Sequence, residues 1–319
     1  MSTGLGRPAL LQRRSVQGWL RLGTVVLWAH VAPAWGQELQ QARRATDRPG
    51  ASARAWLQRG FAELRAGNPE PARDACRTAR GQAPDAWRAE LCIGRAEHAL
   101  GRWEAGDRAL HRAARQAPSS PRPWRALGDG ALRRSAPRAA EKAFRQALKR
   151  APESARLQLR LGLALSRQQR WTEAETALRE ALRRKPALYH AHLNLGVVQV
   201  ATGRPDEARA SYLEATRIDP DAPEAWHNLG NLARRQGDLT GAARYHGRAF
   251  EAAPERPSLG LAALASAVAS GKRELALRIT KRLEALRLSE DQSQTLERLR
   301  RALEPKPETP AKKGSPAAD

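Results

Sequence analysis

The sequence predicts an all-α solenoid, built from helix pairs that stack on one another along the chain. Landmark residues recur every 34 residues, a glycine returns at one phase of each copy, and a proline closes each copy. Six copies follow without an insertion: 53–86, 87–120, 121–154, 155–188, 189–222 and 223–256. Because every copy repeats the same unit, each is expected to contact mainly its neighbours.

The glycine at position 8 of each copy predicts a close approach of two helices. A glycine inside a helix costs about 1 kcal/mol relative to alanine, so its return at one phase indicates a packing requirement. The six glycines are Gly60, Gly94, Gly128, Gly162, Gly196 and Gly230. Small residues at positions 20 and 27 indicate the same requirement on the second helix.

Proline and turn-forming residues divide each copy into two helices. The proline at position 32 cannot continue a helix and therefore ends the second one. Between the helices the chain reads AGNPEP, LGRWEA, TGRPDE or QGDLTG, which are turn-forming runs.

The landmarks of the sixth copy resemble the tetratricopeptide repeat, whose pattern is W-x2-L-G-x2-Y…A-x3-F…P. Trp226, Leu229, Gly230, Ala242 and Pro254 occupy its positions. The first copy departs from the pattern with Arg59 where leucine is expected. The resemblance implies a right-handed superhelix whose first helices line a concave peptide-binding groove.

Residues 1–36 have the pattern of a secretory signal peptide. Four arginines precede an apolar run from Leu22 to Val31, and small residues at Ala34 and Gly36 favour cleavage before Gln37. The apolar run is short for a membrane span, which needs about 20 residues. We expect cleaved export to the periplasm or cell envelope of a bacterium; an uncleaved anchor and a cytosolic protein are the alternatives.

The remaining segments flank the repeats. Residues 37–52 are expected to be a linker or a partial capping helix, and 257–304 a degenerate seventh repeat followed by a capping helix. Ser289 and Gln292 have the spacing of a capping box at the start of that last helix. The tail 305–319 lacks an apolar period and is expected to be disordered.

The net charge is strongly positive. The formal charge of +23 falls to +19 without residues 1–36, which hold four arginines and no acid. Such a charge raises the question of nucleic acid, but export argues against it, and only eight of the 56 basic residues are lysine. A solvated basic surface and a preference for acidic partners remain the two readings.

Cys76 and Cys92 lie on neighbouring predicted helices. An oxidising compartment permits a disulfide between them, but spacing alone does not establish the geometry. We favour two separate small core or groove residues and keep the disulfide as the alternative.

The resemblance assigns the groove to positions 2, 5, 6, 9, 12 and 13 of each first helix. Copies two to four then present arginines suited to binding carboxylates or phosphates. Asp129 and Arg133 also hold groove positions in the third copy. The candidate groove residues are Arg88, Arg95, Arg122, Arg125, Arg156, Arg160, Arg167, His190, Asn194, His227, Asn228, Asn231 and Arg234.

Asn194 and Asn228 share one phase and are similar to the asparagine ladder in the repeats of O-linked N-acetylglucosamine transferase. That resemblance implies that the two amides hold the backbone of an extended peptide. The alternative is that both asparagines only belong to the repeat consensus. The carboxylate clamp of chaperone-binding repeats is excluded, because Leu57 and Phe61 stand where it needs lysine and asparagine.

The sequence predicts a noncatalytic protein without cofactor or metal. No phosphate-binding glycine loop, nucleophile elbow or zinc spacing occurs. We therefore expect an exported scaffold that binds a peptide or protein segment of acidic character, in envelope assembly, secretion or a surface-polymer system. The alternatives are a receptor for a nonprotein polyanion, such as an anionic envelope polysaccharide, and an accessory subunit of a separate enzyme. Nucleic acid is not expected, and membrane contact is expected only with an uncleaved leader.

Overall fold

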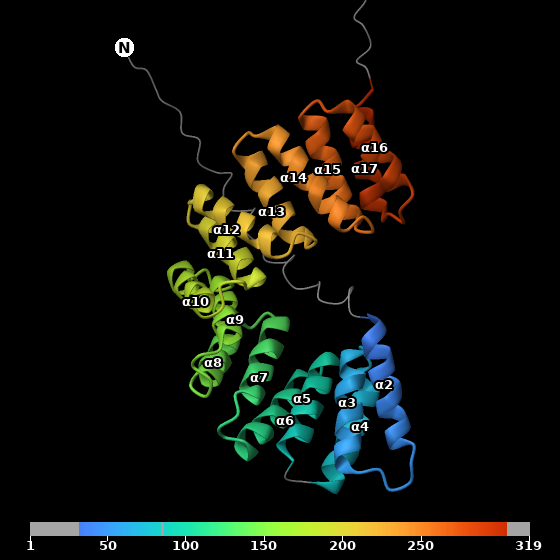
Figure 1. Cartoon of the computed structure of the whole chain (residues 1–319), viewed down its shortest axis with the longest axis vertical. Helices are drawn as coiled ribbons and strands as arrows, with labels where there is room; N and C mark the ends of the chain where they lie inside the picture. Colours follow the sequence, from blue (N-terminus) through green and yellow to red (C-terminus); the bar gives the residue numbers. More distant parts are fainter. Residues whose placement is uncertain (1–31, 84–85, 305–319) are drawn as a thin grey trace, which may run out of the picture. The chain divides into compact units, whose positions relative to one another are not determined.

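The computed structural model describes residues 32–83 and 86–304, which form sixteen helices and no strand (Figure 1). The first helices of the pairs, the A helices, are α3 (Ala53–Arg65), α5 (Trp87–Ala99), α7 (Arg122–Arg133), α9 (Ala155–Ser166), α11 (Tyr189–Ala201), α13 (Pro223–Arg235) and α15 (Pro257–Ala269). The B helices are α4 (Pro69–Gln82), α6 (Trp103–Gln116), α8 (Pro137–Leu148), α10 (Trp171–Arg184), α12 (Pro205–Ile218), α14 (Leu239–Ala252) and α16 (Arg273–Glu284). The predicted fold class, all-α with helix–turn–helix repeats, is confirmed.

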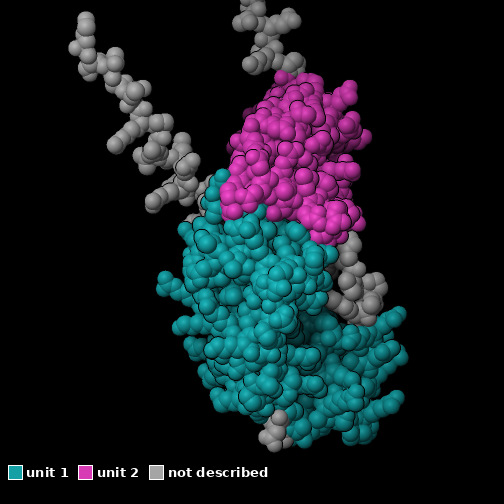
Figure 2. Space-filling model, turned by 60° about the vertical axis from the view of Figure 1, so that its left-hand side comes forward, with its two compact units in different colours: residues 1–203 teal, residues 204–319 magenta. Residues whose placement is uncertain are grey.

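The chain divides into two compact units, coloured separately in Figure 2. Unit 1 ends at Gly203 and unit 2 begins at Arg204, so the division falls in the turn between α11 and α12. Unit 1 contains the A helices α3 to α11, and unit 2 contains α13 and α15. Within each unit, every helix packs mainly against the next along the chain.

The turn between the A and B helices needs one residue in the left-handed conformation. Glycine supplies it at Gly67, Gly101, Gly203, Gly237 and Gly271, with φ between 69° and 81°. In the third and fourth repeats the same position holds Ser135 and Gln169, with φ of 58° and 60°. Both non-glycine residues therefore adopt a backbone conformation that costs about 1–2 kcal/mol.

The position-8 glycine forms a socket for the side chain sixteen residues further on, at position 24 of the same repeat. A Cβ atom on Gly94, Gly128 or Gly162 would lie closer than 3.0 Å to Leu110, Phe144 or Leu178, respectively. The predicted close approach of the two helices is confirmed at these glycines. We call this contact the glycine socket.

Alanines complete the core between the helices. Those at position 20, including Ala72, Ala140, Ala174 and Ala242, are completely buried. Ala113, Ala147, Ala181 and Ala249, at position 27, are also completely buried. A methyl group there fills the space and still lets the helix backbones approach.

Helix α2 (Ala32–Thr46) precedes the first repeat and packs on α3. It begins inside the predicted leader and continues past the expected cleavage point before Gln37. Its main tie lies beyond that point, where Arg43 donates two hydrogen bonds of 2.8 and 3.0 Å to the buried Glu63 carboxylate. Cleavage before Gln37 therefore leaves this tie in the mature chain.

Helix α17 (Glu290–Arg301) covers the other end of the repeats. The capping box is present: Ser289 accepts from the Gln292 backbone, and the Gln292 side chain accepts from the Ser289 backbone. Leu296 and the following Leu303 join the core that contains Leu264 and Leu283. No helix within the described residues is long and apolar enough to cross a membrane.

Candidate peptide-binding face

The A helices of unit 1 form a layer of their own. Helix α5 contacts α3 on one side and α7 on the other, and α9 contacts α11. Side chains of α9 reach α7, where Arg160 pairs with Asp129. Residues at positions 5, 6, 9 and 13 of these helices therefore belong to one continuous face, which we call the A-helix face. Of the predicted groove residues of unit 1, those at these positions are Arg95, Arg125, Arg160, Arg167 and Asn194.

Four arginines gather around one carboxylate on the A-helix face. Arg160 of α9 approaches Asp129 of α7 at 3.0 Å. The charges of Arg125, Arg133 and Arg95 also act on Asp129, so α5, α7 and α9 all contribute. We call Arg95, Arg125, Arg133 and Arg160 with Asp129 the arginine cluster; its formal charge is positive, because one acid faces four guanidinium groups.

The arginine cluster carries more positive charge than its surroundings compensate. Arg125 is exposed and makes no ion pair with a described residue. Arg95 lies over the Phe61 ring at 5.8 Å, and Arg133 over the Trp103 ring at 5.8 Å. An aromatic ring attracts a cation but leaves its guanidinium donors available.

Two buried acids elsewhere in unit 1, Glu90 and Glu97, are each shared by two arginines. Glu90 accepts two hydrogen bonds of 3.0 Å from Arg112 and lies 3.5 Å from Arg80. Glu97 lies 3.1 Å from Arg77 and 3.7 Å from Arg102. These pairs compensate positive charge toward the B helices, whereas the arginine cluster keeps an excess.

Burial affects the pKa values of the arginine cluster. It lowers the pKa of Arg95, and the neighbouring charge of Arg125 lowers it further. It lowers the pKa of Arg133 as well. Guanidinium groups stay protonated despite such shifts, so partial burial raises the free energy of the unpaired charges, and a bound anion would lower it.

The other predicted arginines lie outside the arginine cluster. Arg88, Arg122 and Arg156, at position 2, are exposed. Arg167 donates a 2.6 Å hydrogen bond to the Leu132 backbone carbonyl and ties α9 to α7. The structure thus brings together three predicted residues, Arg95, Arg125 and Arg160. Asp129 holds a groove position in the sequence, but nothing in the sequence marks it as the centre of this cluster.

The predicted polar residues of the fifth and sixth repeats belong to both units. His190 and Asn194 lie on α11 in unit 1, and the Asn194 amide donates a 2.6 Å hydrogen bond to the His190 carbonyl. Asn228 and Asn231 are half-buried on α13 of unit 2, and Arg234 is exposed there. The asparagine ladder stays a prediction.

His227 packs inward, against a second histidine. Its ring centroid lies 5.2 Å from that of His246, which occupies the glycine socket of Gly230. His246 Nδ1 is hydrogen-bonded to Ser266 Oγ at 2.7 Å. Burial lowers the pKa of His246 to about 3 and that of His227 to about 4, so both rings are neutral near pH 7.

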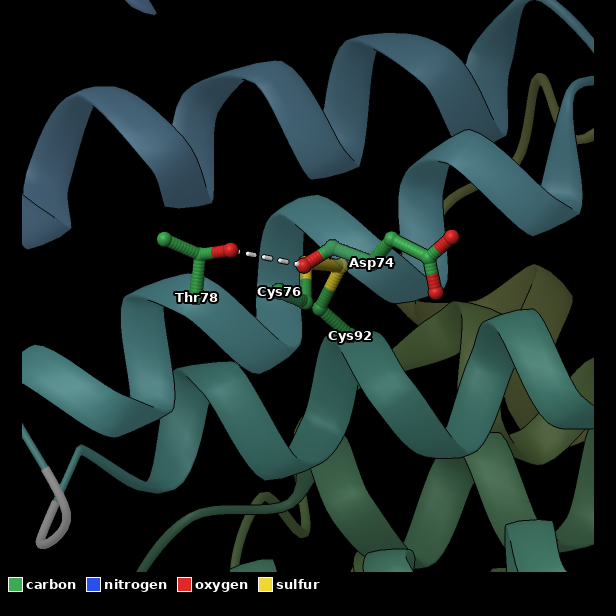
Figure 3. Close-up of a disulfide and its surroundings, with 4 residues drawn as sticks. All are labelled: Asp74, Cys76, Thr78 and Cys92. Carbon is green, nitrogen blue, oxygen red and sulfur yellow. Dashed lines mark hydrogen bonds between the residues drawn. A yellow bond between two sulfur atoms is a disulfide. The ribbon is translucent and has the colours of Figure 1, made fainter.

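Cys76 and Cys92 form a disulfide (Figure 3). It joins α4 of the first repeat to α5 of the second, with the Cα atoms 6.0 Å apart. Both sulfurs lie against Gly60, so the disulfide occupies the glycine socket of the first repeat. The expectation of two separate small residues is therefore wrong in this structure, because the missing glycine side chain leaves room for both sulfurs.

Residues 32–83 and 86–304 contain no group of three His, Cys, Asp or Glu side chains that could hold a metal ion. The arginine cluster offers hydrogen-bond donors and positive charge around one carboxylate. Its chemistry suits recognition of an anionic group.

Residues 125–189, 159–223 and 193–257 match the tetratricopeptide repeat family. Residues 125–257 therefore consist of tetratricopeptide repeats. No curated protein sequence matches it. The transferase-type resemblance of the repeats stays a prediction.

Solved structures share the fold. PilF of Pseudomonas aeruginosa is 22% identical, with 67% of this chain and 98% of that chain covered and a TM-score of 0.55. PilW, a type IV pilus biogenesis factor, is 21% identical, with 66% of this chain and 98% of that chain covered and a TM-score of 0.56. A chain of the APC/C hetero-tetramer Cut9-Hcn1 is 13% identical, with 83% of this chain and 52% of that chain covered and a TM-score of 0.59. At these identities the likeness shows the fold alone.

Proposed function

We propose that this protein is an exported, noncatalytic scaffold that binds an acidic peptide or protein segment on the A-helix face of unit 1. The arginine cluster carries the proposal, because three successive A helices direct guanidinium groups to one place with a single acid between them. Arginine binds carboxylates through paired hydrogen bonds. The tetratricopeptide fold supports a protein partner.

The chemistry of the leader and the disulfide supports export. Disulfides persist in oxidising compartments and are rare in the cytosol, and Cys76 and Cys92 are both fully buried in the structure. A structural relative, PilW, is a type IV pilus biogenesis factor, in line with an assembly role in the bacterial envelope. Mass spectrometry of the mature amino terminus in the native host tests this point: we expect Gln37, and an intact Met1 in the cytosol would contradict export.

Charge reversal at the arginine cluster tests the binding proposal. Fluorescence anisotropy would compare a glutamate-rich peptide with its glutamine counterpart. We expect Arg125→Glu to weaken binding of the glutamate peptide by about tenfold or more, which corresponds to 1.4 kcal/mol. Asp129→Asn should strengthen binding, because it removes the competing carboxylate.

A matched control separates the arginine cluster from the net charge. Arg209 is exposed on α12, a B helix of unit 2, and Arg209→Glu makes the same change in net charge. We expect near-unchanged affinity for this variant and an unchanged thermal melt for both. Equal losses in the two variants, or no loss in Arg125→Glu, would contradict the proposal. Polysaccharide binding that survives competition by the glutamate-rich peptide but collapses in moderate salt would favour the polyanion receptor.

The asparagine ladder is tested separately. We expect Asn194→Ala combined with Asn228→Ala to weaken peptide binding several-fold without a change in the helical melt, because both side chains are partly accessible. Unchanged affinity in a folded double variant would exclude a role for the two amides.

A further inference from the structure

A hollow lies on the opposite side of α7 from the arginine cluster. It has a volume of about 570 Å³ and is lined by residues of α6, α7 and α8, among them His111, Trp124, Lys142 and Lys149. Residues advance by 100° around a helix, so Trp124, Leu127 and Ala131 of α7 face away from Arg125, Asp129 and Arg133. The hollow is therefore separate from the proposed peptide-binding face.

Trp124 lacks a hydrogen bond that the equivalent side chains of two other repeats make. In the sixth repeat, the Trp226 indole donates a hydrogen bond of 2.8 Å to the carbonyl of Pro220, six residues earlier. In the fifth repeat, the His192 ring bonds to the carbonyl of Pro186, also six residues earlier, at 2.9 Å. The equivalent acceptor for Trp124 is the Pro118 carbonyl.

Arg150 occupies that acceptor in the third repeat. Its Nε donates a 2.7 Å hydrogen bond to the Pro118 carbonyl, and its guanidinium lies 5.2 Å from the centroid of the Trp124 ring. The Trp124 Nε1 atom is buried and has no acceptor within the described residues. An unsatisfied buried donor is costly, so an incoming acceptor would be favoured at this ring.

The charge at the hollow suits an anionic acceptor. Lys142 and Lys149 of α8 are exposed and make no ion pair with any residue that the structure describes. Arg134 is held by Asp107 at 2.9 Å. The exposed His111 ring meets the Trp124 ring edge-on at 5.8 Å and extends the aromatic wall. Two unpaired cations therefore flank an aromatic surface.

We infer that this hollow, the Trp124 hollow, binds a carboxylate side chain of a partner protein, with an adjacent apolar side chain against the Trp124 and His111 rings. Lys142 and Lys149 pair with the carboxylate, and the Trp124 indole donates to an oxygen of the bound segment. The inference is independent of the proposed function, since it uses another face of unit 1.

The test uses a blocked dipeptide of phenylalanine and aspartate, titrated into the mature protein and followed by the indole N–H signals in nitrogen-15 NMR. The Trp124 signal is assigned by its absence in Trp124→Phe. We expect a saturable shift of that signal, and binding about tenfold weaker in Lys142→Glu with Lys149→Glu. Trp124→Phe keeps the aromatic ring and should weaken binding several-fold, as measured by calorimetry.

Two controls make the outcome decisive. Arg209→Glu with Arg248→Glu makes the same change in net charge on B helices of unit 2 and should leave binding unchanged. A dipeptide with asparagine in place of aspartate should bind weakly. An unmoved Trp124 signal, equal binding of both dipeptides, or equal loss in the unit 2 control would overturn the inference, whatever the result for the arginine cluster.

Discussion

The first repeat of unit 1 and the sixth repeat of unit 2 fill the same glycine socket with different chemistry. Against Gly60 lies the disulfide of Cys76 and Cys92, and against Gly230 lies the imidazole of His246. The repeats between them in unit 1 use leucine or phenylalanine. The backbone thus fixes the space but not its chemistry, so the two sockets should respond to different conditions: the socket of Gly60 to reductant and the socket of Gly230 to acid.

A side chain added at the socket glycine should strongly destabilise the sixth repeat. We expect Gly230→Ala to lower the free energy of unfolding by about 2 kcal/mol, because its Cβ would overlap the His246 ring. Gly247, on α14, has no heavy atom within 4 Å of an added Cβ. Gly247→Ala should therefore raise stability by up to about 1 kcal/mol. Urea unfolding followed by circular dichroism would compare them, and equal effects would contradict the socket.

Reduction of the disulfide should have a comparable effect, confined to unit 1. With the two cysteines sixteen positions apart in the sequence, the chain-entropy estimate for the cross-link is about 3 kcal/mol. Dithiothreitol, or Cys76→Ala with Cys92→Ala, should lower the urea midpoint of the transition that involves the first repeats. Hydrogen exchange of α13 and α14 in unit 2 should stay the same. A loss of protection in both units would show that the effect is not local.

Acid should destabilise unit 2 through His246. The pKa of His246 is about 3 in the folded chain, against about 6.5 in an unfolded one. Below pH 6.5 the unfolded state binds this proton more readily, so the free energy of unfolding falls as the pH drops toward 3. The loss is on the order of a few kcal/mol.

A variant isolates this histidine from the carboxylates that also titrate in acid. His246→Phe with Ser266→Ala places in the sixth repeat the ring that Phe144 supplies in the third. Melts at pH 7 and pH 5 should then differ less than in the parent chain. An unchanged difference would exclude His246 as the acid-sensitive group.

The smallest effect is expected at the turn of the fourth repeat. Gln169 has φ of 60° where other repeats use glycine, and it is exposed. Gln169→Gly should raise stability by up to about 1 kcal/mol, because glycine adopts this conformation without steric cost. Gln168→Gly, one residue earlier, is the control and should lower stability, since Gln168 holds Glu141 at 2.9 Å.

Features that repeat in sequence could be predicted, and features that depend on one long side chain could not. The period located the position-8 glycines, and the spacing of Ser289 and Gln292 gave the capping box. Both are local or periodic signals. The sequence did not predict that α2 begins inside the leader, because α2 is held by the hydrogen bond of Arg43 to Glu63, which lies on a different helix.

The candidate sites show the same limit. The resemblance to the tetratricopeptide repeat placed arginines at groove positions, but their convergence on Asp129 depends on side chains from three repeats. The Trp124 hollow was missed altogether. Arg150 is one arginine among many in the sequence, and nothing local shows that it takes the Pro118 carbonyl from Trp124.

Site-specific photocrosslinking in the native host tests the central claim most directly. A benzoylphenylalanine would replace Leu163, at a groove position of α9, or Thr176, exposed on the B helix α10. We expect the benzoylphenylalanine at position 163 to crosslink to an acidic segment of an envelope protein, and Arg125→Glu to abolish that crosslink. We expect no crosslink from position 176. Equal crosslinks from both positions, or a Leu163 crosslink that survives Arg125→Glu, would contradict it.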